Sequence, residues 1–290
     1  MSRTPSRARS RTDNLPVFDD IKPWGAYAPK AWQRVLLAAT RALPATLRRL
    51  VFALRKPIKY GARHALDVTV WDVKLRLLPR GNITETDVLF SPQFFDPEER
   101  VMLAAQLQAG GTFVDIGANA GIYSFWANHC MHGRGHVLAV EPDPEMLRRL
   151  RFNVQANGMS QVEVCPVALS DHQGVGELLV NPAQRGENTL DVHEAEAVGA
   201  RRIVQPVELD TLLHLLQSRG ISQVDALKID IEGYEPPVLR HFFANAPSTL
   251  WPRLAITEYK PATAAVIEGL FLSNGYRRVL FNGMNFAFAR

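Results

Sequence analysis

Short apolar runs alternate with amphipathic segments through most of the chain after residue 111. Each run has the length of a buried strand, and each intervening segment has the 3.6-residue period of a helix. This order predicts a doubly wound α/β fold, in which helices cover both faces of a mostly parallel sheet. The predicted strands are 113–116, 137–140, 162–167, 226–229 and 254–256, and the predicted helices are 123–130, 144–156, 211–218, 236–243 and 263–273.

Further elements follow from local signals. Residues 73–77 alternate apolar and charged side chains, which predicts a strand with one face in water. Asn282-Gly283 separates two apolar runs and predicts a hairpin. Residues 181–202 have no apolar period, so we expect a long loop near the site rather than a core element. The predicted helix caps are Asp96 before a helix over 97–108, Asp143 and Asp210.

The first part of the chain differs from the rest in charge. Residues 1–63 contain 14 Lys and Arg against 3 Asp and Glu, whereas the remainder contains 19 against 26. Residues 1–14 hold a single large apolar group, which predicts disorder. The pattern therefore divides the chain into a basic leader (1–14), a basic helical extension (15–66) and an α/β domain (67–290).

The basic extension has helical leucine spacing between Pro29 and Tyr60 and is interrupted by Pro44. This pattern predicts two helices that meet at a bend. One interpretation is a helical cap packed on the main domain, with its basic face in water. The other is attachment to an anionic membrane surface. The second interpretation would use Arg41, Arg48, Arg49, Arg55 and Lys56.

Composition favours an ordinary globular protein, with 47% hydrophobic and 21% charged residues. Cys130 and Cys165 form no spaced framework, which is typical of a reduced intracellular protein. No apolar stretch approaches the ~20 residues of a membrane-spanning helix, and the N-terminus lacks the apolar centre of a secretory signal. We therefore expect a cytoplasmic protein, and leave open a peripheral contact with a membrane.

A glycine-containing loop follows the first strand of the α/β domain. The strand opens directly into Gly117-Ala118-Asn119-Ala120-Gly121 and then a helix. Glycines there let the backbone turn sharply and let a ligand approach the amide groups. Roughly twenty residues later, Glu141 ends the next strand, where a carboxylate can accept both hydroxyls of a ribose. Together these signals predict an adenosine-bearing cofactor at the carboxyl ends of the strands.

The loop departs from the pattern that binds dinucleotides. Asn119 stands at the second glycine of Gly-x-Gly-x-x-Gly, so a pyrophosphate would have poor access. Asp115 would repel a diphosphate but suits the ammonium and sulfonium groups of S-adenosylmethionine. The charge pattern thus favours this cofactor over NAD. The alternatives are an NAD-dependent oxidoreductase, or a nucleic-acid-binding protein that uses the Arg-rich leader; the acidic body argues against a nucleic-acid substrate.

Four segments resemble the FkbM-type methyltransferases, in that family's order: 113–124, 140–144, 167–171 and 227–235. The resemblance covers about residues 95–260. It implies a Rossmann-type sheet of seven strands, mostly parallel, with an antiparallel last strand. It also implies O-methylation of a hydroxyl on a carbohydrate, glycolipid or secondary metabolite, with S-adenosylmethionine as cofactor. By position, it puts Asp115, Gly117, Asn119 and Gly121 at the amino-acid part of the cofactor, Glu141 at the ribose, and Val167, Ala168, Ser170 or Asp171 at the adenine.

Acidic side chains follow the ends of two predicted strands: Asp230, Glu232 and Glu235 after one, and Glu258 after the next. Methyl transfer to a hydroxyl needs alignment and removal of the hydroxyl proton. We expect Asp230, Glu232 or Glu258 to be the general base, with Lys228 and Tyr259 orienting the acceptor. Converging carboxylates could instead hold a divalent cation, but no metal is predicted. The plain alternative is that Asp230 caps a turn and the glutamates are solvated.

Overall fold

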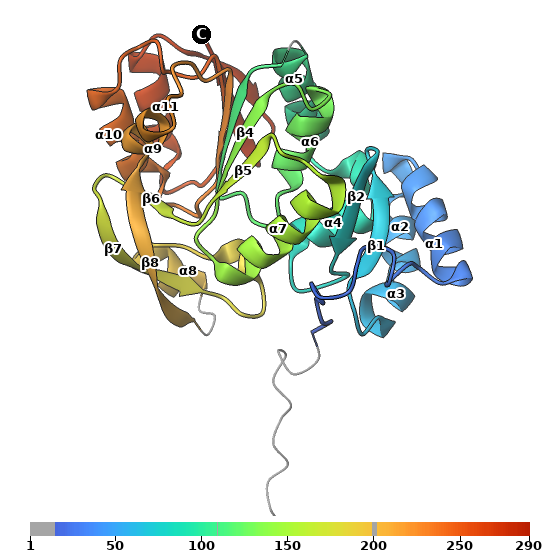
Figure 1. Cartoon of the computed structure of the whole chain (residues 1–290). Coiled ribbons are helices and arrows are strands. Elements are labelled where there is room, and N and C mark those ends of the chain that lie inside the picture. The colour runs from blue at the N-terminus through green and yellow to red at the C-terminus, as the bar shows by residue number, and fades with distance from the viewer. Residues whose placement is uncertain (1–14, 109, 199–201) are drawn as a thin grey trace, which may run out of the picture.

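The computed structural model describes residues 15–108, 110–198 and 202–290 (Figure 1). The predicted disorder of residues 1–14 lies outside these ranges. The helices are α1 (Ala31–Ala42), α2 (Arg48–Leu54), α3 (Lys56–Gly61), α4 (Ile83–Phe90), α5 (Pro97–Leu107), α6 (Ile122–Cys130), α7 (Pro144–Asn157), α8 (Val192–Val198), α9 (Leu212–Ser218), α10 (Glu235–Asn245) and α11 (Ala264–Ser273), with short 3-10 turns at Ala45–Leu47, Pro92–Phe94 and Arg185–Glu187. The strands are β1 (Leu66–Val70), β2 (Val73–Leu77), β3 (Thr112–Ile116), β4 (His136–Val140), β5 (Val162–Cys165), β6 (Ala168–Ser170), β7 (Gly174–Val180), β8 (Ile203–Thr211), β9 (Ala226–Ile229), β10 (Leu254–Glu258), β11 (Arg277–Phe281) and β12 (Asn285–Ala289).

The central sheet has, within the described residues, seven strands in the order β11-β12-β10-β9-β3-β4-β5. β10, β9, β3, β4 and β5 are parallel to one another. β12 runs antiparallel to β10, and Asn282-Gly283 turns the chain between β11 and β12, as the hairpin signal predicts. The predicted mostly parallel sheet with an antiparallel last strand is therefore confirmed.

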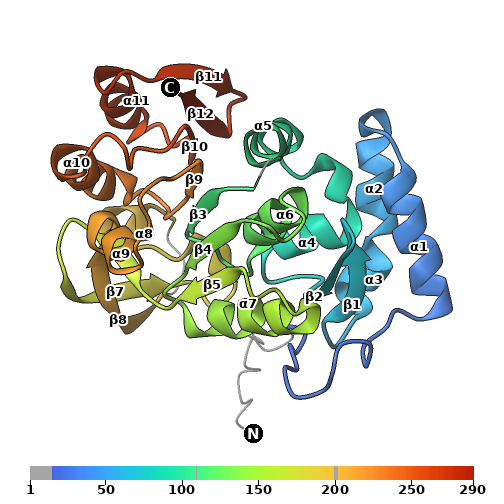
Figure 2. The ribbon, with the colours of Figure 1, turned by 45° about the horizontal axis from the view of Figure 1, so that its top comes forward.

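The inner strands of this sheet, from β12 to β4 in its order, are buried on both faces because alternate side chains enter two different cores. Phe113 and Val137 pack in the core under α5, α6 and α7. Val114 and Leu138, one residue further along each strand, pack in the core under α9, α10 and α11. Figure 2 shows the two helical layers on opposite sides of the sheet, so the predicted doubly wound architecture is confirmed.

The predicted strand over 73–77 forms as β2, but its expected water-facing side is wrong for Arg76. β2 pairs with β1, which the sequence did not reveal. Lys74 is exposed, whereas the Arg76 side chain is fully buried, and its Nε lies 2.6 Å from Oδ1 of Asp67. The guanidinium also donates to the carbonyls of Lys22 and Pro23. An arginine with this many acceptors can be buried at a strand position that patterning assigns to water.

The basic extension is helical, and its chain breaks at Pro44 as predicted. It forms three helices instead of two, because a separate helix, α3, begins at Lys56. Leu37, Val51 and Ile58 are buried, and Leu37 and Ile58 belong to the core that includes β2 and β3. The extension therefore packs on the domain. No helix in the described part of the chain has the length and apolar content to cross a bilayer.

Of the three predicted caps, Asp143 and Asp96 stand at the N-cap positions, whereas Asp210 does not. Asp143 caps α7, since its Oδ1 accepts a hydrogen bond from the Glu145 amide at 2.9 Å. At α9 the cap is Thr211, whose hydroxyl accepts from the His214 amide, and not Asp210. Asp96 precedes α5 but makes no capping bond, because its left-handed backbone turns the carboxylate away to accept from the Tyr123 hydroxyl at 2.8 Å.

A second sheet, in the order β6-β8-β7, lies beside the carboxyl ends of the central strands (Figure 1). The predicted strand over 162–167 ends at Cys165, and the chain crosses to β6 in this second sheet. β7 and β8 were not predicted. The expected long loop over 181–202 connects them, and it contains a 3-10 turn at Arg185–Glu187 and the helix α8.

Candidate functional site

The loop after β3 is shaped by a close approach of two backbones. Gly117 has φ +75°, and a Cβ there would lie 1.9 Å from the carbonyl oxygen of Asp230. Its amide donates to the carbonyl of Val140 at 3.0 Å. Only glycine fits between these neighbours. Gly121 has a different role, because a Cβ there would enter the packing of Leu150 and Phe125 under α6.

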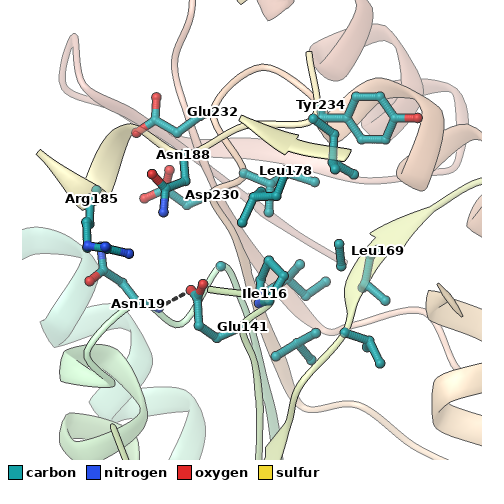
Figure 3. Close-up of a pocket in the computed structure, with 18 residues that line it drawn as sticks. Ile116, Asn119, Glu141, Leu169, Leu178, Arg185, Asn188, Asp230, Glu232 and Tyr234 are labelled. Atoms are coloured by element: carbon teal, nitrogen blue, oxygen red, sulfur yellow. Dashed lines mark hydrogen bonds between the residues drawn. The ribbon is translucent and has the colours of Figure 1, made fainter. Parts of the chain in front are cut away.

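Glu141, just after β4, holds this loop with both carboxylate oxygens. One oxygen accepts from the Asn119 amide at 2.8 Å (Figure 3). The other accepts from the Asp143 amide, also at 2.8 Å. The side chain is buried. Burial, with the nearby Asp143, raises the pKa of Glu141 to about 8 against the opposing effect of the amide bonds. A polar group poised at a strand end in this way can accept hydroxyl donors from a ligand.

Glu141 lines a narrow pocket, which we call the Glu141 pocket. Its walls combine strand ends, the second sheet and the segment 185–190, and include Gly117, Asn119, Val167, Ala168, Leu169, Leu178, Leu190, Asp230, Glu232 and Tyr234. The pocket holds about 50 Å³, well below the ~300 Å³ at the low end for ligand sites. A cofactor therefore requires a wall to move.

The segment 185–190 forms one wall of the Glu141 pocket, and polar contacts of three of its side chains hold it in place. Arg185 Nη1 lies 2.7 Å from Oδ2 of Asp143, and Asn188 donates to the same carboxylate at 2.8 Å. The Thr189 hydroxyl donates to the carbonyl of Glu232 at 2.9 Å. These polar contacts close the pocket without a large apolar interface, so the segment can release at modest cost.

A second, wider cavity adjoins the first and holds about 430 Å³. We call it the Glu258 cavity, because Glu258 lines it and does not line the Glu141 pocket. The two share Gly117, Asn119, Gly186, Asp230 and Glu232. The wider cavity is also lined by Asp87, Phe95, Asp96, Asp115, Tyr123, Gln184, Glu187, Lys228, Tyr259, Met284 and Asn285. A group bound in one space would face a group bound in the other.

Three carboxylates meet at the junction. Asp230, Glu232 and Glu258 each offer an oxygen, and these atoms lie within 4.8 Å of one another. Lys228 Nζ lies 2.7 Å from Asp230 Oδ2, and Lys260 Nζ lies 2.8 Å from Glu232 Oε2 and 3.4 Å from Glu258 Oε2. The sequence therefore predicted the convergence correctly, while Lys260 was missed.

The protonation of this group reflects burial and mutual repulsion. Burial, followed by the charge of Asp230, raises the pKa of Glu258 to about 8 and that of Glu232 to about 7, although Lys260 opposes both shifts. Burial lowers the pKa of Lys228, but Asp230 and Asp115 more than offset it, so the net shift is upward and Lys228 stays charged. The cavity thus contains acids that exchange protons near neutral pH.

This arrangement can also be compared with a metal site. Three clustered carboxylates are oxygen ligands of the kind that hard divalent cations prefer. Lys260 already lies between Glu232 and Glu258 and supplies the positive charge there. The three carboxylates thus have an internal counter-ion in Lys260.

Two of the six non-glycine residues with positive φ in the described chain lie at the same junction. Asn119 has φ 54° and Glu232 has φ 56°, a left-handed conformation unusual for residues with a side chain. Both residues line both cavities. Strained positions of this kind often occur where a chain must present groups to a ligand.

Of the other residues predicted to bind the cofactor, some line one of the two cavities and others line neither. Asp115 is buried at the end of β3, accepts from the Ser124 hydroxyl at 2.6 Å, and lines the Glu258 cavity. Ala168 lines the Glu141 pocket. Gly121, Ser170 and Asp171 line neither cavity. Ser170 is buried beside the Tyr234 hydroxyl, and the exposed Asp171 pairs with His172.

Sequence reasoning gave no defined role to Arg185 and Asn188, and none to Lys260. The first two belong to a segment without periodicity, and only the folded chain shows that both contact Asp143. Lys260 follows Glu258 by two residues, a spacing that places both side chains on the same side of an extended chain. That spacing was the available signal.

Several known proteins resemble this chain. The family described as the methyltransferase FkbM domain matches residues 115–277. The 31-O-demethyl-FK506 methyltransferase FkbM of Streptomyces tacrolimicus is 30% identical over 198 residues, covering 59% of this chain and 74% of that protein. Methyltransferase sdnD of Sordaria araneosa is 29% identical over 161 residues, covering 47% of this chain and 62% of that protein. The structure of an S-adenosylmethionine-dependent O-methyltransferase from Thermotoga maritima superposes with a TM-score of 0.39 and 11% identity, covering 67% of this chain and 65% of that chain.

Proposed function

The chain belongs to the FkbM methyltransferase family, and from that premise we propose that it methylates a hydroxyl oxygen of a carbohydrate, glycolipid or secondary metabolite, with S-adenosylmethionine as donor. The observation that carries the proposal is the junction of a narrow pocket with a wider acidic cavity. The name of the Streptomyces relative describes an O-demethyl substrate, which is methylated on oxygen. That name supports oxygen as the acceptor atom here.

The Glu141 pocket suits the adenosine part of the donor. Glu141 would accept the ribose hydroxyls, and Ala168 and Leu178 offer apolar contact for the adenine. Asp115, at the boundary with the Glu258 cavity, would face the ammonium group of the amino-acid part. When bound, S-adenosylmethionine supplies an electrophilic methyl group on a sulfonium, with a neutral thioether as the leaving group. The remaining chemistry belongs to the acceptor side.

Glu258 is the general base in this proposal. The acceptor oxygen forms a bond to the methyl carbon as the carbon–sulfur bond breaks, and its proton passes to a carboxylate. Asp230 is paired with Lys228, and Glu232 with Lys260. Glu258 Oε2 is buried and lies 3.4 Å from Lys260 Nζ, a longer contact than the other two pairs, and it accepts no hydrogen bond from any described residue. A pKa of about 8 suits a base that must take a proton near neutral pH.

The lining charge selects against anionic acceptors. Two cations, Lys228 and Lys260, contact the carboxylates of the Glu258 cavity. The carboxylates outnumber them, and they are Asp87, Asp96, Asp115, Glu187, Asp230, Glu232 and Glu258. A phosphate or carboxylate on the acceptor would be repelled in such a space. Arg185 does not offset this charge, because Asp143 already pairs with it. An uncharged hydroxyl compound therefore fits better than an anionic sugar.

A labelling experiment tests the proposal. Purified protein is incubated with methyl-labelled S-adenosylmethionine and an extract of small molecules, lipids and glycans. We expect the label in a base-stable methyl ether. The Glu258→Gln variant should transfer the methyl group at least about 100-fold more slowly than the parent protein, and it should still bind S-adenosylhomocysteine. Glu177→Gln, at an exposed carboxylate, is the matched control. Label found in protein or nucleic acid, or binding of NAD in place of S-adenosylhomocysteine, would contradict the proposal.

A further inference from the structure

The helical extension carries an unusual concentration of positive charge. Residues 21–66 contain ten Lys and Arg and no Asp or Glu. Figure 2 shows α1, α2 and α3 at the outer edge of the molecule, with the β1–β2 hairpin and α4 between them and the central sheet. Their outer surface is therefore available to a partner, and its charge favours an anionic one.

One stretch of this extension is exposed without interruption. Every residue from Pro44 to Leu50 is exposed. Leu47 and Leu50 are 44% and 45% accessible, and Arg48 and Arg49 stand between them. In α2, the helix that begins at Arg48, Val51 is the buried residue. We call Pro44–Leu50 the basic turn.

The structure also separates the arginines that hold the fold from those that face outward. Arg41 donates to the carbonyl of Leu89 at 3.1 and 2.9 Å, and Arg55 lies 3.1 Å from Asp87. Both arginines attach the extension to α4. Arg48 and Arg49 are exposed, so the basic turn carries its charge to the surface.

We propose that the basic turn docks the protein on an anionic lipid surface. Exposed leucines flanked by arginines are typical of helices that lie in the membrane interface, where the apolar side chains enter the acyl boundary and the cations meet lipid phosphates. A nucleic acid would use the arginines but would leave Leu47 and Leu50 in water. The apolar component is therefore the reason to favour a bilayer.

The position of the turn links docking to the wider cavity. Arg55, at the end of α2, pairs with Asp87, and Asp87 lines the Glu258 cavity. A docked extension would thus hold one wall of that cavity close to the bilayer. The docking itself does not depend on the proposed methyl transfer.

Vesicle sedimentation with the full-length protein tests this inference. We expect binding to vesicles of phosphatidylcholine with about 30% phosphatidylglycerol, no binding to phosphatidylcholine alone, and release by high salt. Arg48→Glu with Arg49→Glu should weaken binding at least about 20-fold, since each surface arginine contributes roughly fivefold. Leu47→Ser with Leu50→Ser should also weaken vesicle binding, although this double substitution leaves the charge of the protein unchanged. The matched control is Arg151→Glu with Arg277→Glu, two exposed arginines outside the extension.

The substitutions are on the surface, so thermal unfolding of each variant should match that of the parent protein. Equal binding by the Arg48→Glu/Arg49→Glu variant and the control would overturn the inference. The inference would also fail if the parent protein bound no vesicles but bound single-stranded RNA or a DNA duplex, and the Arg48→Glu/Arg49→Glu variant lost that binding. The turn would then bind nucleic acid. If the Leu47→Ser/Leu50→Ser variant bound vesicles as tightly as the parent protein, the leucines would not enter the bilayer and the proposed docking would be wrong.

Discussion

Glu141 makes the binding of adenosine compounds depend on pH. In the free protein its pKa is raised to about 8, first by burial and then by Asp143. A ribose would donate two hydroxyl hydrogen bonds to this group, and the ionised carboxylate is the better acceptor. The ligand therefore prefers the ionised form. Affinity should rise as the pH increases through 8, and binding below that pH should release a proton.

The size of the effect follows from this pKa. A group with a pKa of 8 is about 3% ionised at pH 6.5 and about 75% ionised at pH 8.5. If the ligand binds only the ionised form, affinity increases about 25-fold over this interval, or about 1.9 kcal/mol. Most of the increase falls below pH 8, and the curve flattens above it.

Calorimetry with 5′-methylthioadenosine isolates the ribose contact. This compound has the adenosine and the thioether of the cofactor but no amino-acid group that would titrate in the same range. Titrations at pH 6.5, 7.5 and 8.5, in buffers of different ionisation enthalpy, give both the affinity and the number of protons released. Glu141→Gln should bind more weakly and without pH dependence, while Glu258→Gln, outside this pocket, should keep the slope. An affinity for the parent protein that is constant across these pH values would refute the role of Glu141.

Three other substitutions have defined outcomes. Gly117→Ala should abolish binding of methylthioadenosine, because its Cβ would collide with the Asp230 carbonyl. The control is Gly158→Ala, also at a left-handed position but in open space, which should bind normally and lose about 1 kcal/mol of stability. Arg76→Met should lower the free energy of unfolding by about 3–5 kcal/mol, because Asp67 remains buried without its partner. Denaturant unfolding measures this loss, and Arg76→Met with Asp67→Asn should recover part of it. Arg185→Ala should speed release of S-adenosylhomocysteine about 10-fold in stopped-flow traces; an unchanged rate would show that segment 185–190 is no barrier.

The sequence predicts the central sheet because most of its strands are short, mainly apolar runs that end at a turn signal. It does not predict β7 and β8, since their outward residues are mostly exposed and β8 contains Pro206. The burial of Arg76 could not be predicted from the sequence either. Its burial depends on Asp67 and on backbone carbonyls from residues 22 and 23, and no local pattern describes partners that the fold brings together.

The site divides along the same line. Glu141, Asp230 and Glu258 could be predicted because each follows the end of a parallel strand, and those ends share one edge of the sheet. The pairing of Lys260 with Glu232 could not, since it joins two separate loops. The closure by Arg185 depends equally on tertiary contact, in this case with Asp143.

The two cavities meet where the topology separates the helices. The connection after β3 enters α6 on one face of the sheet, and the connection after β9 enters α10 on the other face. A crevice opens at such a point in an open α/β sheet. The loops that leave these strands also touch, since the Asp230 amide donates to the carbonyl of Ile116 at 3.0 Å and Gly117 leaves no room for a side chain. This contact fixes Asp230 and Glu232 against the cofactor loop, so donor and acceptor spaces share a wall instead of lying in separate clefts.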